Sequence, residues 1–382
     1  VLKNESYQNI NKYTIQGGTA MGYVKWSYET LNQFCRDVFC RFGFSEEESH
    51  TIRDVLLLAD LYGIESHGMQ RMVRYHKGIE KGTIHVEAKP EVVFETPVSA
   101  VIDGHSGMGQ LISDFAMNKA IEKAKTIGIG VVTVRESNHF GIAGYYAKMA
   151  SDPGLLGMAC SNSEAIMVPT FGREAMLGSN PIAVAMPADP YPFFFDCPTT
   201  VVTRGKLEMY NKMNKPLPQS WALDANGRES TSAPEVLSNI VHKSGGGIMP
   251  LGGCQEVTGS HKGYGYGMLC ELFSSIFSLG VNSDQCCTFP DKTGICHGFL
   301  AMNPAIFGDA EAIRKHLSDF LETLRQSPKA EGQERIYTHG EKEVLAEKER
   351  REHGIPVNDN TMVELADLCS YLKLDFGSYF PG

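Results

Sequence analysis

The sequence predicts a mixed α+β fold, in which a helical unit accompanies a central sheet domain. Residues 25–82 carry helical periodicity and helix-capping residues, whereas residues 129–200 carry short apolar runs separated by polar turns that contain glycine or proline. Short runs of this kind are typical of a mixed or antiparallel sheet, because a doubly wound parallel sheet would alternate strands and helices regularly.

Composition argues against several classes of protein. The chain has 382 residues, of which 42% are hydrophobic and 21% charged, as in ordinary soluble proteins of two or three domains. A net charge of −10 without a long basic run argues against a nucleic acid or an anionic membrane as the partner. No apolar run approaches the roughly 18 residues that span a bilayer, and no signal-peptide pattern opens the sequence. We therefore expect a cytoplasmic protein.

The cysteines also favour a cytoplasmic protein. There are ten of them, they form no CxxC pair, and most lie in apolar surroundings. This usage is typical of reduced thiols in a cytosolic protein. Because no Cys/His cluster has the spacing of zinc ligands, we expect no metal site.

The N-terminal part begins with residues 1–22, which are polar and aperiodic. We expect a flexible tail there, and deletion of residues 1–20 should leave activity intact. From Ser27 an apolar stripe predicts a helix that stops at Gly43. Ser45 and Glu48 then form a capping box, which starts a second helix that ends near residue 63.

A third helix is predicted from the segment that follows, up to Gly78 or Gly82. On one helix, the spacing of His67, Arg71 and Arg74 would place their side chains on the same face. An imidazole moves a proton near neutral pH, and a guanidinium grips a carboxylate through two hydrogen bonds. The segment therefore predicts a site for a small carboxylic acid, although a solvated helix face carries the same residues equally often.

A dinucleotide-binding fingerprint is imitated at Gly107-Met-Gly109. Strand-like runs at 91–96 and 100–104 precede these glycines, and a helical run over 112–127 follows. The third glycine of the fingerprint would fall at Ile112, and Arg135 stands where an acidic residue is needed. A glycine turn that lets backbone segments pack closely is the better interpretation.

The central sheet domain is predicted from the strands that follow. Strands are expected at 129–134, 155–160, 177–187, 193–197 and 298–304, helices at 143–150, 205–215 and 268–279, and a loop at 216–234. The glycines and Lys262 before the last of these helices are typical of an anion site, although close packing explains such a turn equally well. Further helices at 310–325, 341–353 and 361–372 are expected to pack on the N-terminal helices. The expected division is a helical domain of 23–95 completed by 310–382, and a sheet domain of 96–309.

Six blocks in order resemble the malate/L-lactate dehydrogenase type 2 family, over about residues 25–372. They are Gly63-Ile-Glu-Ser-His-Gly with Arg71, Ser137-Asn-His-Phe-Gly, Leu177-Gly-Ser-Asn-Pro-Ile-Ala, Phe195-Asp-Cys-Pro-Thr-Thr, Pro250-Leu-Gly-Gly with His261-Lys-Gly-Tyr-Gly, and Tyr337-Thr-His-Gly-Glu. The resemblance implies a non-Rossmann, largely antiparallel sheet domain that binds NAD or NADP, a discontinuous helical domain, and an intertwined homodimer.

The resemblance also implies roles on the substrate side. His67 and His139 would lie at the active site, with the proton-transfer role open between the two. Ser66 would orient His67, and Arg71 would bind the substrate carboxylate. Arg74 matches no position of the family, and for that residue a surface role is the simpler interpretation.

Further positions match where the family holds substrate and cofactor. Ser179 or Asn180 would touch substrate. Two departures stand out: Cys197-Pro198 replaces a common Ala-Thr pair, so that a backbone donor is lost, and Thr338-His-Gly-Glu replaces a common Tyr-Pro-Gly-Glu. The matched cofactor positions are Ser163, Asp196, Cys197, Pro198, Lys262, Gly340 and Glu341.

The activity that the resemblance implies is an NAD(P)-dependent dehydrogenase of class EC 1.1.1. It would transfer a hydride reversibly between a nicotinamide and a small 2-hydroxy or 2-keto acid. Malate and oxaloacetate are the expected pair, because residues 207–227 look most like the family's malate dehydrogenases. The alternatives are lactate, ureidoglycolate or sulfolactate as substrate, a reductase of a cyclic imino acid or a diketo acid, and a non-catalytic nucleotide-binding relative.

Overall fold

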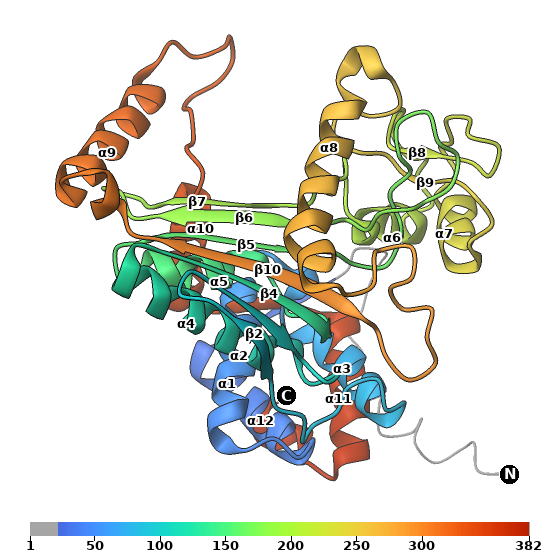
Figure 1. Cartoon of the computed structure of the whole chain (residues 1–382). Coiled ribbons are helices and arrows are strands. Elements are labelled where there is room, and N and C mark those ends of the chain that lie inside the picture. Colours follow the sequence, from blue (N-terminus) through green and yellow to red (C-terminus); the bar gives the residue numbers. More distant parts are fainter. Residues whose placement is uncertain (1–21, 382) are drawn as a thin grey trace, which may run out of the picture.

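A seven-stranded sheet runs through the centre of the protein in the computed structural model, which describes residues 22–381 (Figure 1). Within this sheet only β3 and β4 run parallel, and every other neighbouring pair is antiparallel. A mixed fold with a largely antiparallel sheet is therefore confirmed. The tail expected at 1–22 lies outside the described residues, except for Gly22. In spatial order the strands are β2 (Glu91–Glu95), β3 (Ser99–Asp103), β4 (Ile129–Ser137), β10 (Ile295–Met302), β5 (Leu156–Ser161), β6 (Ile182–Met186) and β7 (Phe193–Cys197).

Glycines mark where helices touch the two faces of this sheet. A Cβ on Gly130 or Gly157 would collide with carbonyl groups of helices on one face, α4 and α5 respectively. Both glycines pair with Ala301 of β10, so Gly298, three residues away, points to the other face. There it lies against the backbone of Phe273 in a π-helix. The helices are α4 (Gly109–Ile127), α5 (Ala143–Ser151), α8 (Ser260–Glu271) and its π-helical continuation η5 (Leu272–Ile276).

The two ends of the described chain build one helical layer together. β1 pairs with β11 in an antiparallel ribbon, and the ring centroids of Trp26 and Phe380 lie 4.9 Å apart. The capping box of Ser45 and Glu48 is present as predicted. The elements are β1 (Tyr23–Trp26), α1 (Tyr28–Arg41), α2 (Glu46–Leu61), α3 (Met72–Glu80), α10 (Glu341–His353), β11 (Ile355–Asn358), α11 (Asp359–Leu372) and α12 (Phe376–Tyr379).

Helix α9 (Ala310–Gln326) lies apart from that layer, beyond the connection between β6 and β7 (Figure 1). Arg314 forms an ion pair with Asp189 at 3.0 Å, and the Asp189 N–H donates to Ser318 Oγ at 2.9 Å. The segment 310–382, which was expected to complete the helical domain, therefore divides. Its later helices pack there, whereas these polar contacts hold α9 near the edge strand β7.

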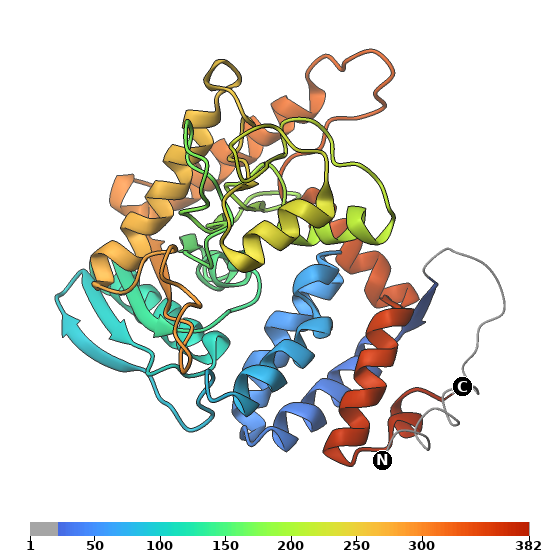
Figure 2. The same ribbon diagram turned by 90° about the vertical axis from the view of Figure 1, so that its right-hand side faces the viewer.

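A small lobe stands above the helical layer (Figure 2). It has its own apolar core, and it contains a strand inside the loop that was expected at 216–234. Its helix α7 was not predicted, although Ser232 caps it and a proline stands in its first turn. The elements are α6 (Arg204–Lys212), β8 (Ala222–Leu223), α7 (Ala233–His242) and β9 (Gly247–Ile248), and short turns occur at η4 (Glu256–Thr258) and η6 (Pro304–Phe307).

None of the helices in 22–381 is both long and apolar enough to cross a membrane. Over the same residues, no group of three or more His, Cys, Asp or Glu side chains is arranged to hold a metal ion. All ten cysteines are free thiols.

Candidate active site

The segment at 60–75 is not the single helix that its spacing predicts. Two short 3-10 turns, η2 (Glu65–His67) and η3 (Met69–Arg71), precede α3, and extended Gly68 separates them. The buried carboxylate of Asp60 causes the break, because it accepts the Met69 N–H at 2.9 Å and leaves no room for a Cβ at Gly68. Burial raises the pKa of Asp60 to about 7. His67 therefore sits on a tight turn rather than on a helix face.

His67 is half-buried and faces His139 across the site. The two ring centroids lie 5.4 Å apart, with the ring planes inclined by 29°. Ser66 Oγ lies 2.9 Å from His67 Nδ1, within hydrogen-bond distance. Burial, then the charges of Arg71 and Arg74, lower the pKa of His67 to about 3. The imidazole is therefore neutral near pH 7.

His139 is held from behind by a chain of buried side chains. Gln110 Nε2 donates to Tyr75 Oη at 2.8 Å, and Tyr75 Oη lies 2.9 Å from His139 Nδ1. The Gly141 N–H donates to the same nitrogen at 3.4 Å. Because an amide N–H only donates, this network assigns Nδ1 as the acceptor and places the proton of neutral His139 on Nε2. Burial, then the charges of Arg74 and His67, hold the pKa of His139 well below its usual range.

The backbone around His139 is fixed by its neighbour Asn138. The Asn138 amide donates to the carbonyl oxygens of Thr83 and Gly107 at 3.0 and 2.9 Å, and its Oδ1 accepts from Thr293 Oγ1 at 2.8 Å. Gly109 lies so close that a Cβ there would collide with the carbonyl oxygens of residues 138 and 139. The glycine pair at 107 and 109 therefore serves close packing, as the sequence favoured.

Arg71 lies beside the two histidines, half-buried. Its Nε donates to the Ser66 carbonyl oxygen at 2.5 Å. Its two terminal nitrogens have no hydrogen-bond or ion-pair partner within 22–381 and stay available to a carboxylate. Burial lowers the pKa of Arg71, and the nearest charges include Arg74 and, on α6, Glu208.

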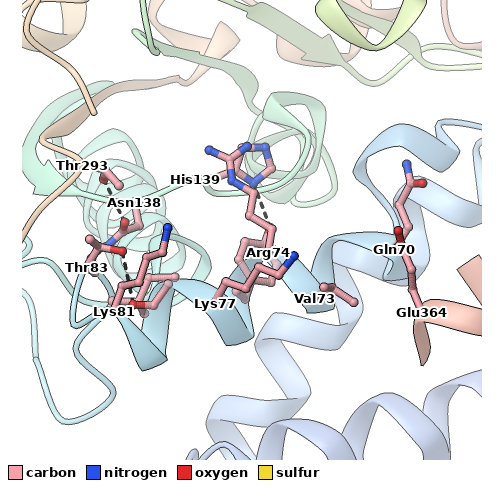
Figure 3. A pocket seen from close by; sticks show the side chains of 13 residues that line it. Gln70, Val73, Arg74, Lys77, Lys81, Thr83, Asn138, His139, Thr293 and Glu364 are labelled. Atoms are coloured by element: carbon pink, nitrogen blue, oxygen red, sulfur yellow. Dashed lines mark hydrogen bonds between the residues drawn. The ribbon is translucent and has the colours of Figure 1, made fainter. Parts of the chain in front are cut away.

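A pocket of about 430 Å³ opens next to His139 (Figure 3). Asn138 and His139 lie at one side of it, and Arg74, Lys77 and Lys81 line it along α3. The pocket connects the histidine with solvent and carries an excess of positive charge on its wall.

Around β6 and β7, Ser163, which was expected at the cofactor, and Ser179, which was expected at the substrate, lie in one continuous strip. The Ser179 N–H donates to Ser163 Oγ at 3.1 Å, and the Thr199 N–H donates to the Ser179 carbonyl at 2.9 Å. The Leu251 N–H in turn donates to the Thr199 carbonyl at 2.9 Å. Gly263, which follows Lys262, packs against the backbone of Leu251. Hydrogen bonds and close packing thus bring together segments of the strip that are far apart in the sequence.

Asp196 joins this strip to the histidine segment. Its Oδ2 accepts the Gly144 N–H at 2.7 Å, in the first turn of α5 and five residues after His139. Burial raises the pKa of Asp196 to about 6 and that of the Cys197 thiol to about 11. Pro198 follows the last paired residue of β7, so its missing N–H removes no hydrogen bond of the sheet.

Gly340 and Glu341 lie along the outer edge of β7. Gly340 has a φ of +100° and packs against the backbone of Phe194 and Pro192, where a side chain has no room. Glu341 is fully buried and is paired with Arg335. Gly340 therefore lies beside the strand that carries Asp196. The carboxylate of Glu341 forms an ion pair with Arg335 and is not free to bind a ligand.

Asn180 was expected at the substrate, but its side chain is turned into a buried polar cluster. Its amide donates to the Gly267 carbonyl at 3.1 Å and to Glu271 Oε1 at 2.9 Å, and its Oδ1 accepts from Ser283 Oγ at 3.2 Å. No free donor remains for a substrate, because both amide hydrogens are engaged.

Three side chains that position the histidines were missed from the sequence. Tyr75, Gln110 and Asp60 are buried and polar, and each belongs to the hydrogen-bond networks around the His67 or His139 segment. Tyr75 lies four residues after Arg71, one turn further along α3, so helical spacing was the available signal. Gln110 and Asp60 carried no local signal.

Comparisons with known proteins place these geometries in context. The family model described as malate/L-lactate dehydrogenase matches residues 26–366. A malate dehydrogenase of Pyrococcus abyssi is 40% identical over 348 residues, which cover 91% of this chain and 94% of that protein. An L-sulfolactate dehydrogenase of Methanocaldococcus jannaschii is 36% identical and covers 90% of this chain and 96% of its own length. The solved structure of a malate dehydrogenase from Entamoeba histolytica superposes with a TM-score of 0.89 at 36% identity, over 93% of this chain and 99% of that one.

Proposed function

The chain belongs to the malate/L-lactate dehydrogenase family, and from that premise we infer that it is an NAD(P)-dependent 2-hydroxyacid dehydrogenase of class EC 1.1.1. It moves a hydride reversibly between the nicotinamide cofactor and a small 2-hydroxy or 2-keto acid. The single observation that carries this function is the facing pair of neutral histidines, His67 and His139, with the free guanidinium end of Arg71 beside them.

Malate and oxaloacetate are the substrate pair that we propose. The similarity to malate dehydrogenases over more than nine-tenths of the chain supports this choice. L-sulfolactate is the second candidate, since a relative of that name is 36% identical. Ureidoglycolate and lactate stand further away, and so does a cyclic imino acid, for which a solved reductase with a TM-score of 0.77 is 24% identical and supports the fold alone.

Different residues of the chain bind the substrate and transfer its proton. Arg71 binds the C1 carboxylate and thereby orients C2, and such positioning contributes much of the lowering of the barrier. One histidine takes the hydroxyl proton during oxidation and returns it during reduction. The Nε2–H of neutral His139 can donate a hydrogen bond to the substrate oxygen, because Tyr75 and the Gly141 N–H occupy Nδ1. Ser66 orients His67 in the same way through Nδ1. The histidine that takes the proton does so on an unprotonated ring nitrogen, and it returns the proton from its imidazolium form. A bound nicotinamide supplies the hydride chemistry.

The strip around β6 and β7 fits a dinucleotide. Hydroxyl groups of Ser163 and Ser179 line it, and Gly178 and Gly340 leave no room for side chains beside it. Lys262 is exposed at the first turn of α8, and its ammonium group has no hydrogen-bond or ion-pair partner within the described residues and fits a phosphate. We propose that NAD or NADP binds here in a non-Rossmann manner, with Asp196 and the Cys197-Pro198 backbone nearby. The glycine pair at 107 and 109 takes no part.

A turnover assay tests the proposal directly. Purified protein is expected to oxidise NADH or NADPH with oxaloacetate. A panel of pyruvate, a sulfonated 2-keto acid and a cyclic imino acid then ranks the alternatives. Cofactor binding without turnover of any substrate on the panel would leave only the non-catalytic alternative.

We also propose a homodimer, and exposed apolar side chains support it. Phe94 on the edge strand β2 is 60% exposed, and Leu279 after η5 is 85% exposed. Val93 and Phe277, which are also exposed, line the same hollow as Phe94 and Leu279. A second copy that covered this surface would also protect the free edge of β2. Sedimentation measurements are expected to give twice the mass of the chain.

We further propose a division into two domains and a cytoplasmic location. The helical domain comprises 23–95 and is completed by the C-terminal helices, and the sheet domain comprises 96–309. The packing of β1 on β11 supports this division. The ten free cysteines support a cytoplasmic location, where thiols stay reduced.

A further inference from the structure

Three cations lie on one side of α3 and have no partner. Arg74, Lys77 and Lys81 follow one another at intervals of three and four residues, which is the spacing of one helix face. All three are exposed, and within 22–381 none of their charged groups forms a hydrogen bond or an ion pair. A wall that carries several charges of one sign attracts ligands of the opposite sign.

These cations line the pocket that begins at His139. Figure 3 shows the Arg74 guanidinium beside the imidazole, with Lys77 and Lys81 further out along the helix. Glu364 is the only acidic side chain of the described residues that lines this pocket. The charge at the wall is therefore positive, and Arg74 is the cation next to His139.

We propose that Arg74 binds the second acidic group of the substrate, so that this site selects 2-hydroxy acids that carry an anionic group at the far end. The inference rests on the proposed dehydrogenase function. It extends that function from any small 2-hydroxy acid to diacids, with a carboxylate or a sulfonate as the distal group.

The geometry of the two arginines supports this division of labour. Arg71 and Arg74 are three residues apart at the start of α3, which corresponds to a rise of about 4.5 Å along a helix. Both influence the pKa of His67 and of His139 through their charges, so both lie close to the histidine pair. Arg71 is partly engaged by the Ser66 carbonyl, whereas Arg74 is free to follow a ligand. Two guanidinium groups that flank two imidazoles match an acid with charge at both ends, because each can bind its group through two hydrogen bonds.

The experiment compares substrates with and without the distal group. Values of kcat/KM are measured for oxaloacetate and pyruvate in the wild type, Arg74→Gln and Lys77→Gln. Arg74→Gln is expected to lower the value for oxaloacetate by about 10–100-fold, the range for a lost hydrogen bond to a charged group. For pyruvate, which has no distal group, the expected change is at most about threefold. Lys77→Gln removes an equal charge one turn further out and is the matched control, with a change of at most about threefold for either substrate.

Two outcomes would overturn the inference. One is an unchanged ratio of the two substrates in Arg74→Gln. The other is an equal loss in Lys77→Gln, which would indicate a general field rather than a contact. Unfolding temperatures with and without malate or lactate provide a readout that does not need turnover. If the wild type turned over no 2-keto acid, the proposed function would be wrong. The role of Arg74 in binding a second acidic group would still be supported if malate raised the unfolding temperature of the wild type more than lactate did, and if Arg74→Gln removed this difference.

Discussion

The two halves of the site are built around similar carboxylates but present different surfaces. On the side that we propose for the substrate, Asp60 accepts the Met69 N–H, and on the side that we propose for the cofactor, Asp196 accepts the Gly144 N–H. Burial raises the pKa of both groups. Around the histidines, the terminal nitrogens of Arg71 and the guanidinium of Arg74 have no partner within 22–381. Around β6 and β7, backbone hydrogen bonds and glycines dominate. The substrate side is thus suited to charge recognition and proton transfer, and the cofactor side to recognition by shape.

The largest expected effect comes from removing either imidazole on the substrate side. His67→Gln and His139→Gln are each expected to keep cofactor affinity and to lower kcat, by about 10²–10⁴-fold for the residue that transfers the proton. Steady-state kinetics with a fluorescence titration of NADH measure both quantities. The variant with the larger fall in kcat identifies the proton-transfer residue, and a loss of NADH binding in either would contradict the division into two halves.

A matched pair of glycine variants tests the same division. In Gly109→Ala the new Cβ would displace the backbone of residues 138 and 139, and kcat is expected to fall by up to about 10²-fold, as for a misplacement of about 1 Å. In Gly340→Ala the positive φ and the collision with Pro192 are on the cofactor side. There we expect a raised KM for NAD(P)H, by about tenfold, with kcat less affected. If both variants changed kcat and the KM for NAD(P)H to the same extent, the two glycines would not support separate sides for substrate and cofactor.

Tyr75→Phe is expected to have a smaller effect. The variant keeps the packing of the ring but removes the hydroxyl that binds His139 Nδ1. The loss of about one hydrogen bond should lower kcat about tenfold, while Arg71 still holds the substrate and KM changes little. Tyr146→Phe, which removes a buried hydroxyl bonded to the Phe140 carbonyl, is a control for the loss of a buried hydroxyl. A larger fall in kcat in that control would show that the effect is structural.

The pH dependence gives a finer test. Arg74 helps to hold the pKa of His139 below its usual range, and a base with a lowered pKa stays unprotonated at lower pH. If His139 is the base, Arg74→Gln should raise its pKa and move the acid limb of kcat/KM for malate oxidation to higher pH. Lys77→Gln should leave that limb in place. A shift to lower pH would contradict the arrangement of charges.

The smallest effect concerns stability at Asp60. Its pKa is about 3.8 in an unfolded chain and about 7 in the folded protein, so the folded state binds the extra proton. The contribution of this group to stability is therefore fully present below about pH 3.8 and is lost as the pH rises through 7. Asp60→Asn keeps an oxygen for the Met69 N–H and cannot ionise. The free energy of unfolding of Asp60→Asn, measured in urea, should exceed that of the wild type at pH 8. The difference between the two proteins should be smaller at pH 5.

Local patterns in the sequence account for much of the fold and half of the site. Capping residues predicted the start of α2, and apolar runs predicted most of the strands. Because Ile112 stands where the dinucleotide-binding fingerprint needs a third glycine, the turn at 107–109 was correctly predicted to serve close packing. The residue types of His67 and Arg71 suggested recognition of an acid, and the resemblance to the family favoured that interpretation over a solvated helix face. These signals are local, because periodicity and capping act over one or two helical turns.

The neighbours of the reacting groups depend instead on tertiary structure. β10 enters between β4 and β5 from more than a hundred residues away, and Tyr75 reaches His139 across 64 residues. Asn180 was expected, as an alternative to Ser179, to touch substrate, but its amide is bonded to Glu271. Arg74 was expected at the surface and is exposed there, and it also lines the pocket of His139. The hydrogen-bond partners and the exposure of these side chains depend on which distant segments pack together. The spacing of residues within one segment does not determine the burial and the charge that result from this packing.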